Sequence, residues 1–289
     1  MLSGRFLLTV ILLFLLTLSG ASALPLWEIQ GTENRIRVLG SVHFLRPQDY
    51  PLPKAITDAY HDADVVVMEL DLSDLDPVES MEIMQRLSID SDGRNLEALM
   101  GGRAYKQAHA IAAKIGIDLG IFMAYEPWFA ALQITQVRLM QLGFDGGNGV
   151  DAYFTRQAVQ DRKMIRGLET LEFQLDSMDS LPPKAQREFL LQTLEDAANI
   201  EETMDGIVKA WKAGDTDTLQ SELMEGLDAQ PELYERILVQ RNKNWASSIL
   251  ALTDDSQDYL IVVGTLHLVG KDSLLRLIED AGYPTQQVK

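Results

Sequence analysis

Two apolar runs constrain the fold of this chain most strongly. One covers residues 65–70 and the other residues 259–268, and both are rich in Val, Ile and Leu. Runs of this length and composition are typical of strands buried on both faces of a parallel sheet, between layers of helices. A Pro-rich loop and a helical pattern over residues 54–63 precede the first run, and this order favours a parallel crossover. The sequence therefore predicts an α/β fold.

Shorter segments add to the predicted sheet. Residues 26–29 and 35–39 have the pattern of a hairpin, with a Gly-Thr-Glu-Asn turn between them. Residues 150–162 have the spacing of a helix, and residues 163–168 read as a further short strand. A sheet that contains both a hairpin and parallel crossovers is mixed, so we expect a mixed central sheet.

Helical patterns occupy much of the remaining chain. They cover about 76–143 and 184–253, and the second alternates charged residues with Leu, Met, Ile and Trp. This alternation is typical of a cap that packs on a sheet with one face and meets solvent with the other. We expect residues 24–289 to form a single α/β domain with a helical insertion over the carboxyl edge of its sheet.

The first 23 residues have the three-part pattern of a secretory signal peptide. A start with one arginine precedes an apolar run over residues 6–18, and Ala21-Ser22-Ala23 follows. The apolar run is shorter than the roughly 18–20 residues that span a bilayer, and no later stretch is long enough either. We expect cleavage after Ala23 and a periplasmic or secreted mature protein. The alternative is an uncleaved N-terminal anchor.

Composition excludes several kinds of chemistry. The chain has no cysteine, which rules out disulfides, a thiolate nucleophile and a cysteine-ligated metal. It has 43 acidic against 25 basic residues, a net charge of −18. Such a surface repels phosphate backbones, so we expect no nucleic-acid partner.

A weak internal repeat is the strongest functional signal. Two of the four histidines lie three places after a glycine, in Gly40-Ser41-Val42-His43 and Gly264-Thr265-Leu266-His267, each with two apolar residues on either side. With glycine at about 7% of residues, two such pairings arise by chance roughly 3% of the time. Ligands of α/β sheets bind beyond the carboxyl ends of the strands. If the two strands are adjacent, both imidazoles enter one crevice.

Glu69 is the third candidate, because it follows Val65-Val66-Val67-Met68 at the end of a buried strand. Two neutral imidazoles and one carboxylate suffice to bind a divalent ion (Mn, Co or Zn) with open positions. A water in an open position would have a lowered pKa. Either histidine taken alone is better explained as a structural residue, but together with Glu69 the two predict a shared metal site of His43, His267 and Glu69.

The other histidines and hydroxyl residues give weaker signals. His61 and His109 lie in helical patterns and are expected to be ordinary surface or half-buried residues. Ser41 and Thr265 stand near histidines, but the chain has no Gly-x-Ser-x-Gly elbow, so a serine hydrolase is disfavoured.

The paired motifs resemble the TraB/GumN family, to which the Tiki proteins are related. Supporting matches run along nearly the whole chain after residue 24: Val67-Met68-Glu69-Leu70-Asp71, Glu126-Pro127-Trp128, Gly149-Val150-Asp151-Ala152-Tyr153-Phe154, Gly167-Leu168-Glu169-Thr170 with Gln174, Arg241-Asn242 with Trp245, and His267-Leu268-Val269-Gly270. The resemblance implies a fold related to erythromycin-esterase-like and haem-binding ChaN-like proteins. It also implies metal or catalytic roles for the two histidines.

The resemblance gives roles to five residues, of which four are additional to the candidates above. It gives Glu69 the acidic role, lets Arg241 and Asn242 line the site from the helical region, and adds Glu169 and Gln174 behind them. We expect Arg241 to stabilise a developing oxyanion, and Glu69 to act as metal ligand or general base.

Three functions remain open at this point. Tiki members are described as metal-dependent proteases, so the leading expectation is an exported metal-dependent hydrolase of a peptide-like bond, with a peptide or protein substrate. The second is a non-catalytic periplasmic protein that binds a peptide or a haem-like ligand. The third is a metal-independent esterase that uses His43 as its base.

Overall fold

The computed structural model describes residues 24–289 except 225 and 228, so the expected signal segment over 1–23 lies outside the described residues. The elements of the first half, in chain order, are β1 (Leu26–Ile29), β2 (Ile36–Ser41), η1 (Pro47–Asp49), α1 (Lys54–Asp62), β3 (Val65–Met68), α2 (Pro77–Ser88), α3 (Leu96–Met100), α4 (Gly102–Lys114), η2 (Leu119–Phe122), α5 (Pro127–Gln141), η3 (Gly146–Asn148), α6 (Val150–Asp161) and β4 (Met164–Gly167). The second half contains α7 (Leu171–Asp179), α8 (Pro183–Asp196), α9 (Ile200–Ala213), α10 (Thr216–Met224), α11 (Pro231–Tyr234), the π-helical η4 (Glu235–Val239), α12 (Gln240–Leu250), β5 (Tyr259–Gly264), η5 (Thr265–Leu268), α13 (Leu274–Asp280) and β6 (Thr285–Gln287).

The strands form one mixed sheet in the order β4-β3-β5-β2-β1-β6. The four strands β4, β3, β5 and β2 are parallel, whereas β1 is antiparallel to both β2 and β6. The hairpin of β1 and β2 and the parallel crossover between β2 and β3 are confirmed. The sequence did not predict β6, which is a three-residue edge strand without an apolar pattern.

Helices cover both faces of the sheet. Along β3, Val66 points to a core shared with α1, α6 and α9, while Val65 and Val67 point to a second core shared with α12 and α13. The alternation follows from the pleat of a strand, and both faces are apolar because both are covered. This arrangement explains why the strand reads as an unbroken apolar run.

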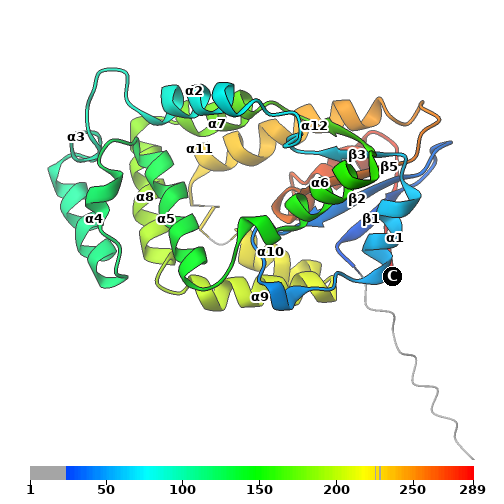
Figure 1. Ribbon diagram of the computed structural model, residues 1–289, viewed down its shortest axis with the longest axis horizontal. Helices are drawn as coiled ribbons and strands as arrows, with labels where there is room; N and C mark the ends of the chain where they lie inside the picture. The colour runs from blue at the N-terminus through cyan, green and yellow to red at the C-terminus, as the bar shows by residue number, and fades with distance from the viewer. Residues whose placement is uncertain (1–23, 225, 228) are drawn as a thin grey trace, which may run out of the picture.

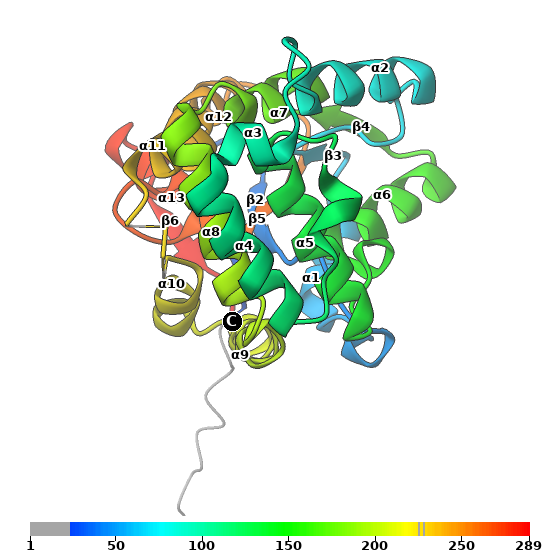
Figure 2. The same ribbon diagram turned by 90° about the vertical axis from the view of Figure 1, so that its left-hand side faces the viewer.

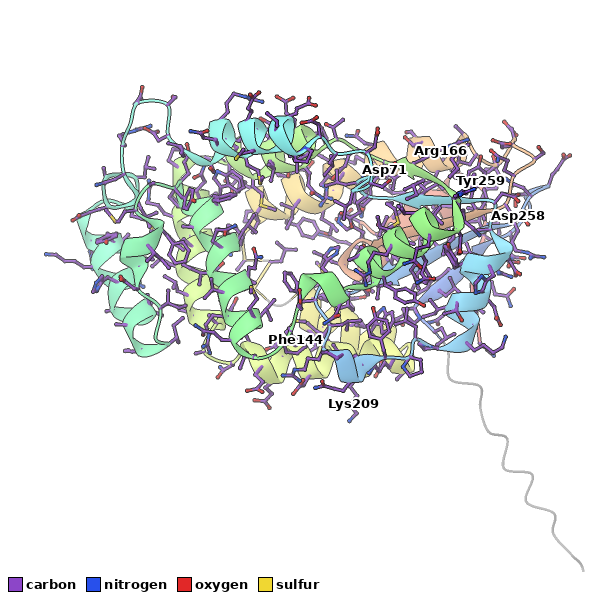
Figure 3. The ribbon with its side chains drawn as sticks, viewed as in Figure 1. Asp71, Phe144, Arg166, Lys209, Asp258 and Tyr259 are labelled. Carbon is purple, nitrogen blue, oxygen red and sulfur yellow. The ribbon has the colours of Figure 1, made fainter. Side chains whose placement is uncertain are left out.

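A further group of helices lies beyond the carboxyl ends of the strands. Helices α3, α4, α5 and α8 share their own buried cluster, in which Leu96, Ala112, Ile134 and Leu190 are fully buried. Figure 1 shows this group on the left and the sheet on the right, and Figure 2 shows α4, α5 and α8 in front of β2 and β5. In Figure 3, Asp258 and Tyr259 mark the amino end of β5 on the far side from these helices. Helices therefore lie over the carboxyl edge as expected, but α9 and α12 of the second helical stretch cover the two faces of the sheet instead.

The ends of the helices follow ordinary capping chemistry. Helix α2 begins at Pro77, and the side chain of Asp76 accepts hydrogen bonds from the backbone N–H groups of Val78 and Glu79. Helix α9 ends at Ala213 and is capped by Gly214, whose φ of 62° is in the left-handed region that favours glycine. In the part of the chain that the structure describes, no helix combines the length and apolarity needed to cross a bilayer.

The run over 259–268 is not a single strand. Strand β5 ends at Gly264, and Thr265–Leu268 forms the 3-10 turn η5. The prediction of one strand through Leu268 was therefore wrong. An apolar run does not distinguish a buried strand from a buried helical turn.

Candidate functional site

Three neighbouring strands carry the predicted residues to one place. In the register of β2 and β5, Ser41 lies beside Gly264, and Met68 at the end of β3 lies beside Val262. His43, Glu69 and His267 follow these strand ends by one to three residues. The two Gly-x-x-His strands are adjacent, so the condition under which both histidines come to one place is met.

Each glycine of the paired motifs makes room for the other motif. A Cβ on Gly264 would lie 3.1 Å from Nε2 of His43 and 3.2 Å from Oε1 of Glu69. A Cβ on Gly40 would lie 2.8 Å from Oγ1 of Thr265. A side chain at either position would therefore press on a side chain of the site, which favours glycine at both.

Glu69 is buried and accepts hydrogen bonds on both carboxylate oxygens. Its Oε1 accepts the backbone N–H of Gly264 at 2.6 Å, and its Oε2 accepts Nη2 of Arg241 at 2.6 Å and Nε2 of Gln174 at 3.2 Å. Only 7% of the residue is exposed. Because a carboxylate oxygen has two lone pairs, Oε1 can accept one more hydrogen bond.

Arg241, near the start of α12, is buried, and its guanidinium is hydrogen-bonded to several residues of the site. Its Nε donates to both oxygens of Glu169 at 3.1 Å, and its Nη2 donates to Glu169 and Glu69. Its Nη1 lies 3.2 Å from the carbonyl oxygen of Ile237 and 3.3 Å from Nε2 of His267. All five N–H donors thus have protein acceptors, and none is left for the oxyanion that the sequence led us to expect.

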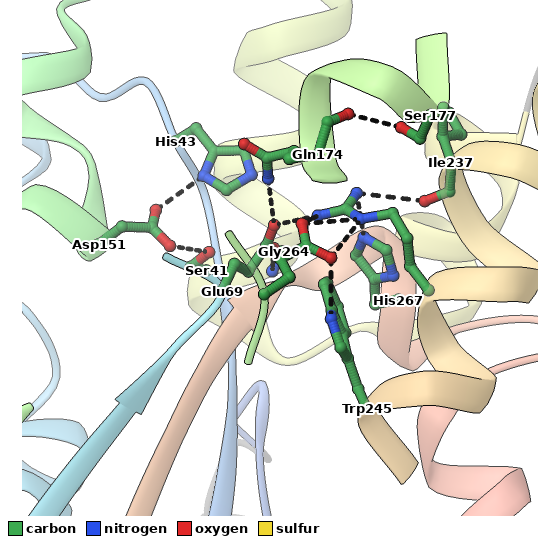
Figure 4. A network of polar contacts seen from close by, with 12 residues as sticks. Ser41, His43, Glu69, Asp151, Gln174, Ser177, Ile237, Trp245, Gly264 and His267 are labelled. Atoms are coloured by element: carbon green, nitrogen blue, oxygen red, sulfur yellow. Dashed lines mark hydrogen bonds and ion pairs between the residues drawn. The ribbon is translucent and has the colours of Figure 1, made fainter. Parts of the chain in front are cut away.

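Trp245 completes the support of the guanidinium. Its ring lies 4.6 Å from the guanidinium carbon of Arg241, and its Nε1 donates to Oε2 of Glu169 at 3.0 Å. Trp245 is one helical turn after Arg241 on α12, so the two side chains share one face. Figure 4 shows Trp245 and His267 together on one side of Glu69.

His267 is a buried, neutral imidazole. Because arginine can only donate, Nε2 of His267 accepts from Arg241, and Nδ1 must carry the hydrogen that Oδ1 of Asn242 accepts at 2.7 Å. Burial lowers the pKa of His267 to about 3. Asn242 in turn donates to the carbonyl oxygens of Asp272 and His267, which fixes its amide.

His43 lies on the other side of Glu69 and is the open member of the cluster. Its side chain is 55% exposed, and its Nδ1 lies 2.8 Å from Oδ2 of Asp151. The other oxygen of Asp151 accepts the hydroxyl of Ser41 at 2.8 Å. Figure 4 shows this chain of Ser41, Asp151 and His43 to the left of Glu69.

The charges around the pocket drive two pKa values apart. The carboxylate of Asp151, with a smaller contribution from Glu69, raises the pKa of His43 to about 9. Burial opposes the ionisation of Glu69, but nearby positive charges and the N–H of Gly264 lower its pKa to about 2. At neutral pH those charges are Arg241 and His43, because His267 is neutral there. A protonated His43 therefore faces an ionised Glu69.

The structure brings together every residue that the sequence placed at the site. Glu69, Gln174, Glu169, Arg241, Asn242 and His267 form one connected set of hydrogen bonds. His43 lies beside Glu69 at Gly264 and is hydrogen-bonded to Asp151 instead. His61 and His109 are exposed on α1 and α4, as expected. Sequence reasoning gave Asp151 and Trp245 no role, although both lie within the segments that carry the family resemblance.

The expected metal ligands do not fit a metal ion as they stand. Nη2 of Arg241 contacts Oε2 of Glu69, and Nη1 of Arg241 contacts Nε2 of His267. Over 24–289 without 225 and 228, no group of three or more His, Asp and Glu side chains is placed to hold a metal ion. A divalent ion between His43, Glu69 and His267 requires Arg241 to withdraw, so the metal site stays a prediction.

A small cavity opens beside the cluster. It has a volume of about 180 Å³, and it is lined by His43, Met68, Glu69, Leu70, Leu72, Asp151 and Gln174. Clefts that hold drug-sized ligands measure roughly 300–1,000 Å³. The cavity therefore suits a side chain or a short stretch of an extended chain rather than a haem-sized ligand.

Both the family model and the similar proteins match this chain over nearly its whole length. A model described as the TraB/PrgY/gumN family matches residues 25–287. The chain is 24% identical over 259 residues to the uncharacterized protein YbaP of Escherichia coli (strain K12), which covers 88% of this chain and 92% of that protein. An uncharacterized protein of Treponema pallidum (strain Nichols) is 18% identical over 265 residues, covering 87% of this chain and 79% of that protein. No solved structure gives a significant match, so the expected likeness to erythromycin-esterase-like and ChaN-like folds stays a prediction.

Proposed function

This chain belongs to the TraB/PrgY/gumN family, and from that premise we propose that it is an exported hydrolase that cleaves a peptide-like bond beside His43 and Glu69. The observation that carries the proposal is the convergence of Nε2 of His43 and Oε1 of Glu69 on Gly264, at 3.1 Å and 3.2 Å from the position of a Cβ there. Both atoms belong to residues that line the small cavity.

The opposed pKa values support an acid and a base at one site. Two titratable groups whose surroundings separate their pKa values are suited to opposite proton-transfer roles. The pKa of His43 is about 9 and that of Glu69 about 2, so at neutral pH His43 holds a proton and Glu69 lacks one. His43 is then the general acid and Glu69 the general base.

The proposed reaction balances its protons within this pair. A water molecule attacks the carbonyl carbon, and one of its protons passes to Glu69. The bond to the leaving nitrogen or oxygen breaks as that atom takes the Nε2 proton of His43. Transfer of a proton from Glu69 back to His43 restores the starting state, and such proton transfer contributes typically 10²–10⁴-fold to a rate.

The remaining residues hold Glu69 in place. Arg241 and Gln174 both donate to its Oε2, which leaves Oε1 directed at Gly264. Glu169 balances the charge of Arg241, and Asn242 orients His267 against the guanidinium. In this proposal Arg241 is a positioning residue and not an oxyanion donor.

The experiment is a cleavage screen on the purified mature protein with a peptide library and a set of simple esters. Each substrate is tested after chelator treatment and again with manganese, cobalt or zinc added. We expect cleavage by the chelator-treated protein, and a loss of at least about 100-fold in His43→Ala and Glu69→Gln. His109→Ala, an exposed histidine on α4, is the matched control and should keep full activity.

The other outcomes separate the rival functions. Activity that appears only with added metal, together with ion binding lost in His43→Ala and His267→Ala but kept in His109→Ala, would replace the proposal with a metal-dependent hydrolase. A peptide that binds without being cleaved would replace it with a binding protein. Cleavage of esters but not of peptides would identify the protein as the metal-independent esterase.

A further inference from the structure

We propose that Asp151 is a positioning residue that fixes the ring of His43, with Nδ1 turned to α6 and Nε2 turned to the pocket. The inference rests on the proposed function only in taking that pocket as the place of reaction. It assigns a role to a residue of the first turn of α6, which the sequence did not single out.

Asp151 is held on both of its carboxylate oxygens. Oδ2 lies 2.8 Å from Nδ1 of His43, and Oδ1 accepts the hydroxyl of Ser41 at 2.8 Å. Ser41 is buried at the end of β2, with 3% of its surface exposed. Because one oxygen is tied to a strand, the other cannot turn away from the imidazole.

The backbone places Asp151 there independently of its side chain. The N–H of Val150 donates to the carbonyl oxygen of Val42 at 3.0 Å, and Leu45 and Asp145 exchange two backbone hydrogen bonds of 3.4 Å and 3.0 Å. A Cβ on Gly149 would lie 2.2 Å from the carbonyl oxygen of His43. The start of α6 can therefore dock on this loop only because residue 149 is glycine.

His43 depends on this contact for its orientation. Its side chain is 55% exposed, so packing restrains the ring weakly. The charged groups that face it are Asp151 from α6, Glu69 from the end of β3 and Arg241 from α12. Of these, Asp151 is the one within hydrogen-bond distance of the ring.

The contact also determines which nitrogen carries hydrogen. An ionised carboxylate only accepts, so Nδ1 of His43 is the donor, and Nε2 is left to face Oε1 of Glu69 across Gly264. A carboxylate behind a histidine fixes the ring in the same way whether its far nitrogen transfers a proton or binds a metal ion. The inference therefore holds for either chemistry.

The test measures the ring of His43 directly. The mature protein is prepared with ¹⁵N-labelled histidine, and the hydrogen on each ring nitrogen is followed by NMR from neutral to alkaline pH. In the wild type, we expect Nδ1 to carry a hydrogen throughout. In Asp151→Ala the neutral ring should lose that hydrogen from Nδ1, and in Asp151→Asn, whose amide oxygen can still accept, it should keep it.

Two further variants guard the result. Asp151→Ser keeps a polar side chain that suits a helix N-terminus but is too short to reach Nδ1. It takes the place of Asp151→Ala if that variant fails to fold, and the neutral ring of His43 should lose its Nδ1 hydrogen in it as well. Asp161→Asn removes a carboxylate from the last turn of α6, where it accepts from Tyr60, and should leave His43 unchanged.

Kinetics give a second readout. With a substrate from the cleavage screen, we expect Asp151→Ala to lower kcat by about 10–100-fold at nearly constant KM. An unchanged His43 spectrum in Asp151→Ala or Asp151→Ser would overturn the inference and leave hydrolysis untouched. If the wild type cleaves no peptide or ester in the screen, the proposed function is wrong, and the NMR result still decides the role of Asp151.

Discussion

Replacing Arg241 by Met tests whether the buried ion pairs exist as described. Methionine fills much of the same space but removes five donors, and it leaves Glu69 and Glu169 buried without their cation. Breaking a buried ion pair by removing one partner is destabilising by about 3–5 kcal/mol. Because typical domains are stable by about 5–15 kcal/mol, this is a large fraction of the free energy of unfolding.

The pKa of Glu69 sets the pH dependence of the same ion pairs. Burial opposes the ionisation of Glu69, but Arg241, His43 and the N–H of Gly264 hold its pKa below the ordinary value of 4.5. A carboxyl whose pKa is lower in the folded state stabilises the fold above its unfolded pKa. This contribution is lost as the pH falls from about 4.5 toward 2. The effect of Arg241→Met should therefore be largest near neutral pH and shrink in acid.

Urea unfolding near neutral pH and near pH ~4 measures both effects. The matched control is Lys243→Ala, an exposed residue of the same helix, which should change the free energy of unfolding by less than about 0.5 kcal/mol. Adding Glu69→Gln to Arg241→Met should recover about 0.5–3 kcal/mol, because one unpaired charge is removed. A loss in Arg241→Met no larger than in Lys243→Ala would refute the buried ion pairs.

Three further predictions follow from the site and the N-terminal segment. Gly264→Ala should lower activity at least about tenfold, roughly 1.4 kcal/mol, because its Cβ displaces His43 and Glu69, whereas Gly102→Ala, with open space around its Cβ, should be silent in the same assay. Arg241→Lys should stay folded by circular dichroism and lose at least about tenfold in kcat/KM, since an ammonium cannot reproduce the planar fork; wild-type kinetics would contradict the positioning role. N-terminal sequencing of the exported protein should begin at Leu24, and a protein that retains Met1 in the membrane fraction would favour the anchor.

Local patterns were sufficient to predict the framework of the fold. The apolar stretch at β3, the turn of the hairpin and the helix spacing of α6 each depend on residues that are close in sequence. The pairing of β2 with β5 does not depend on local patterns, because more than 200 residues separate the two strands in the sequence. That pairing could be predicted only through the matching Gly-x-x-His segments.

The limits of sequence reasoning appear where tertiary contacts decide. The turn η5 carries His267 out of the sheet, yet its residues read as a continuation of β5. Arg241 was expected to face the reaction, but two carboxylates that are distant in sequence occupy its donors. Sequence reasoning gave Asp151 no role, because nothing local shows that its helix docks on the loop of His43.

The glycines explain why the repeat is informative beyond its histidines. Gly40 admits Thr265, whose hydroxyl donates to the carbonyl oxygen of Ser41 at 2.9 Å, and Gly264 admits His43 and Glu69. The glycine of each motif thus leaves room for a side chain of the other motif, so the two motifs form one site together. A Cβ on Gly40 would lie 2.8 Å from Oγ1 of Thr265, and one on Gly264 would lie 3.1 Å from Nε2 of His43, so a side chain at either position would displace the other motif's side chain. The spacing of glycine to histidine is therefore a packing requirement first, and the chemistry of the pocket depends on it.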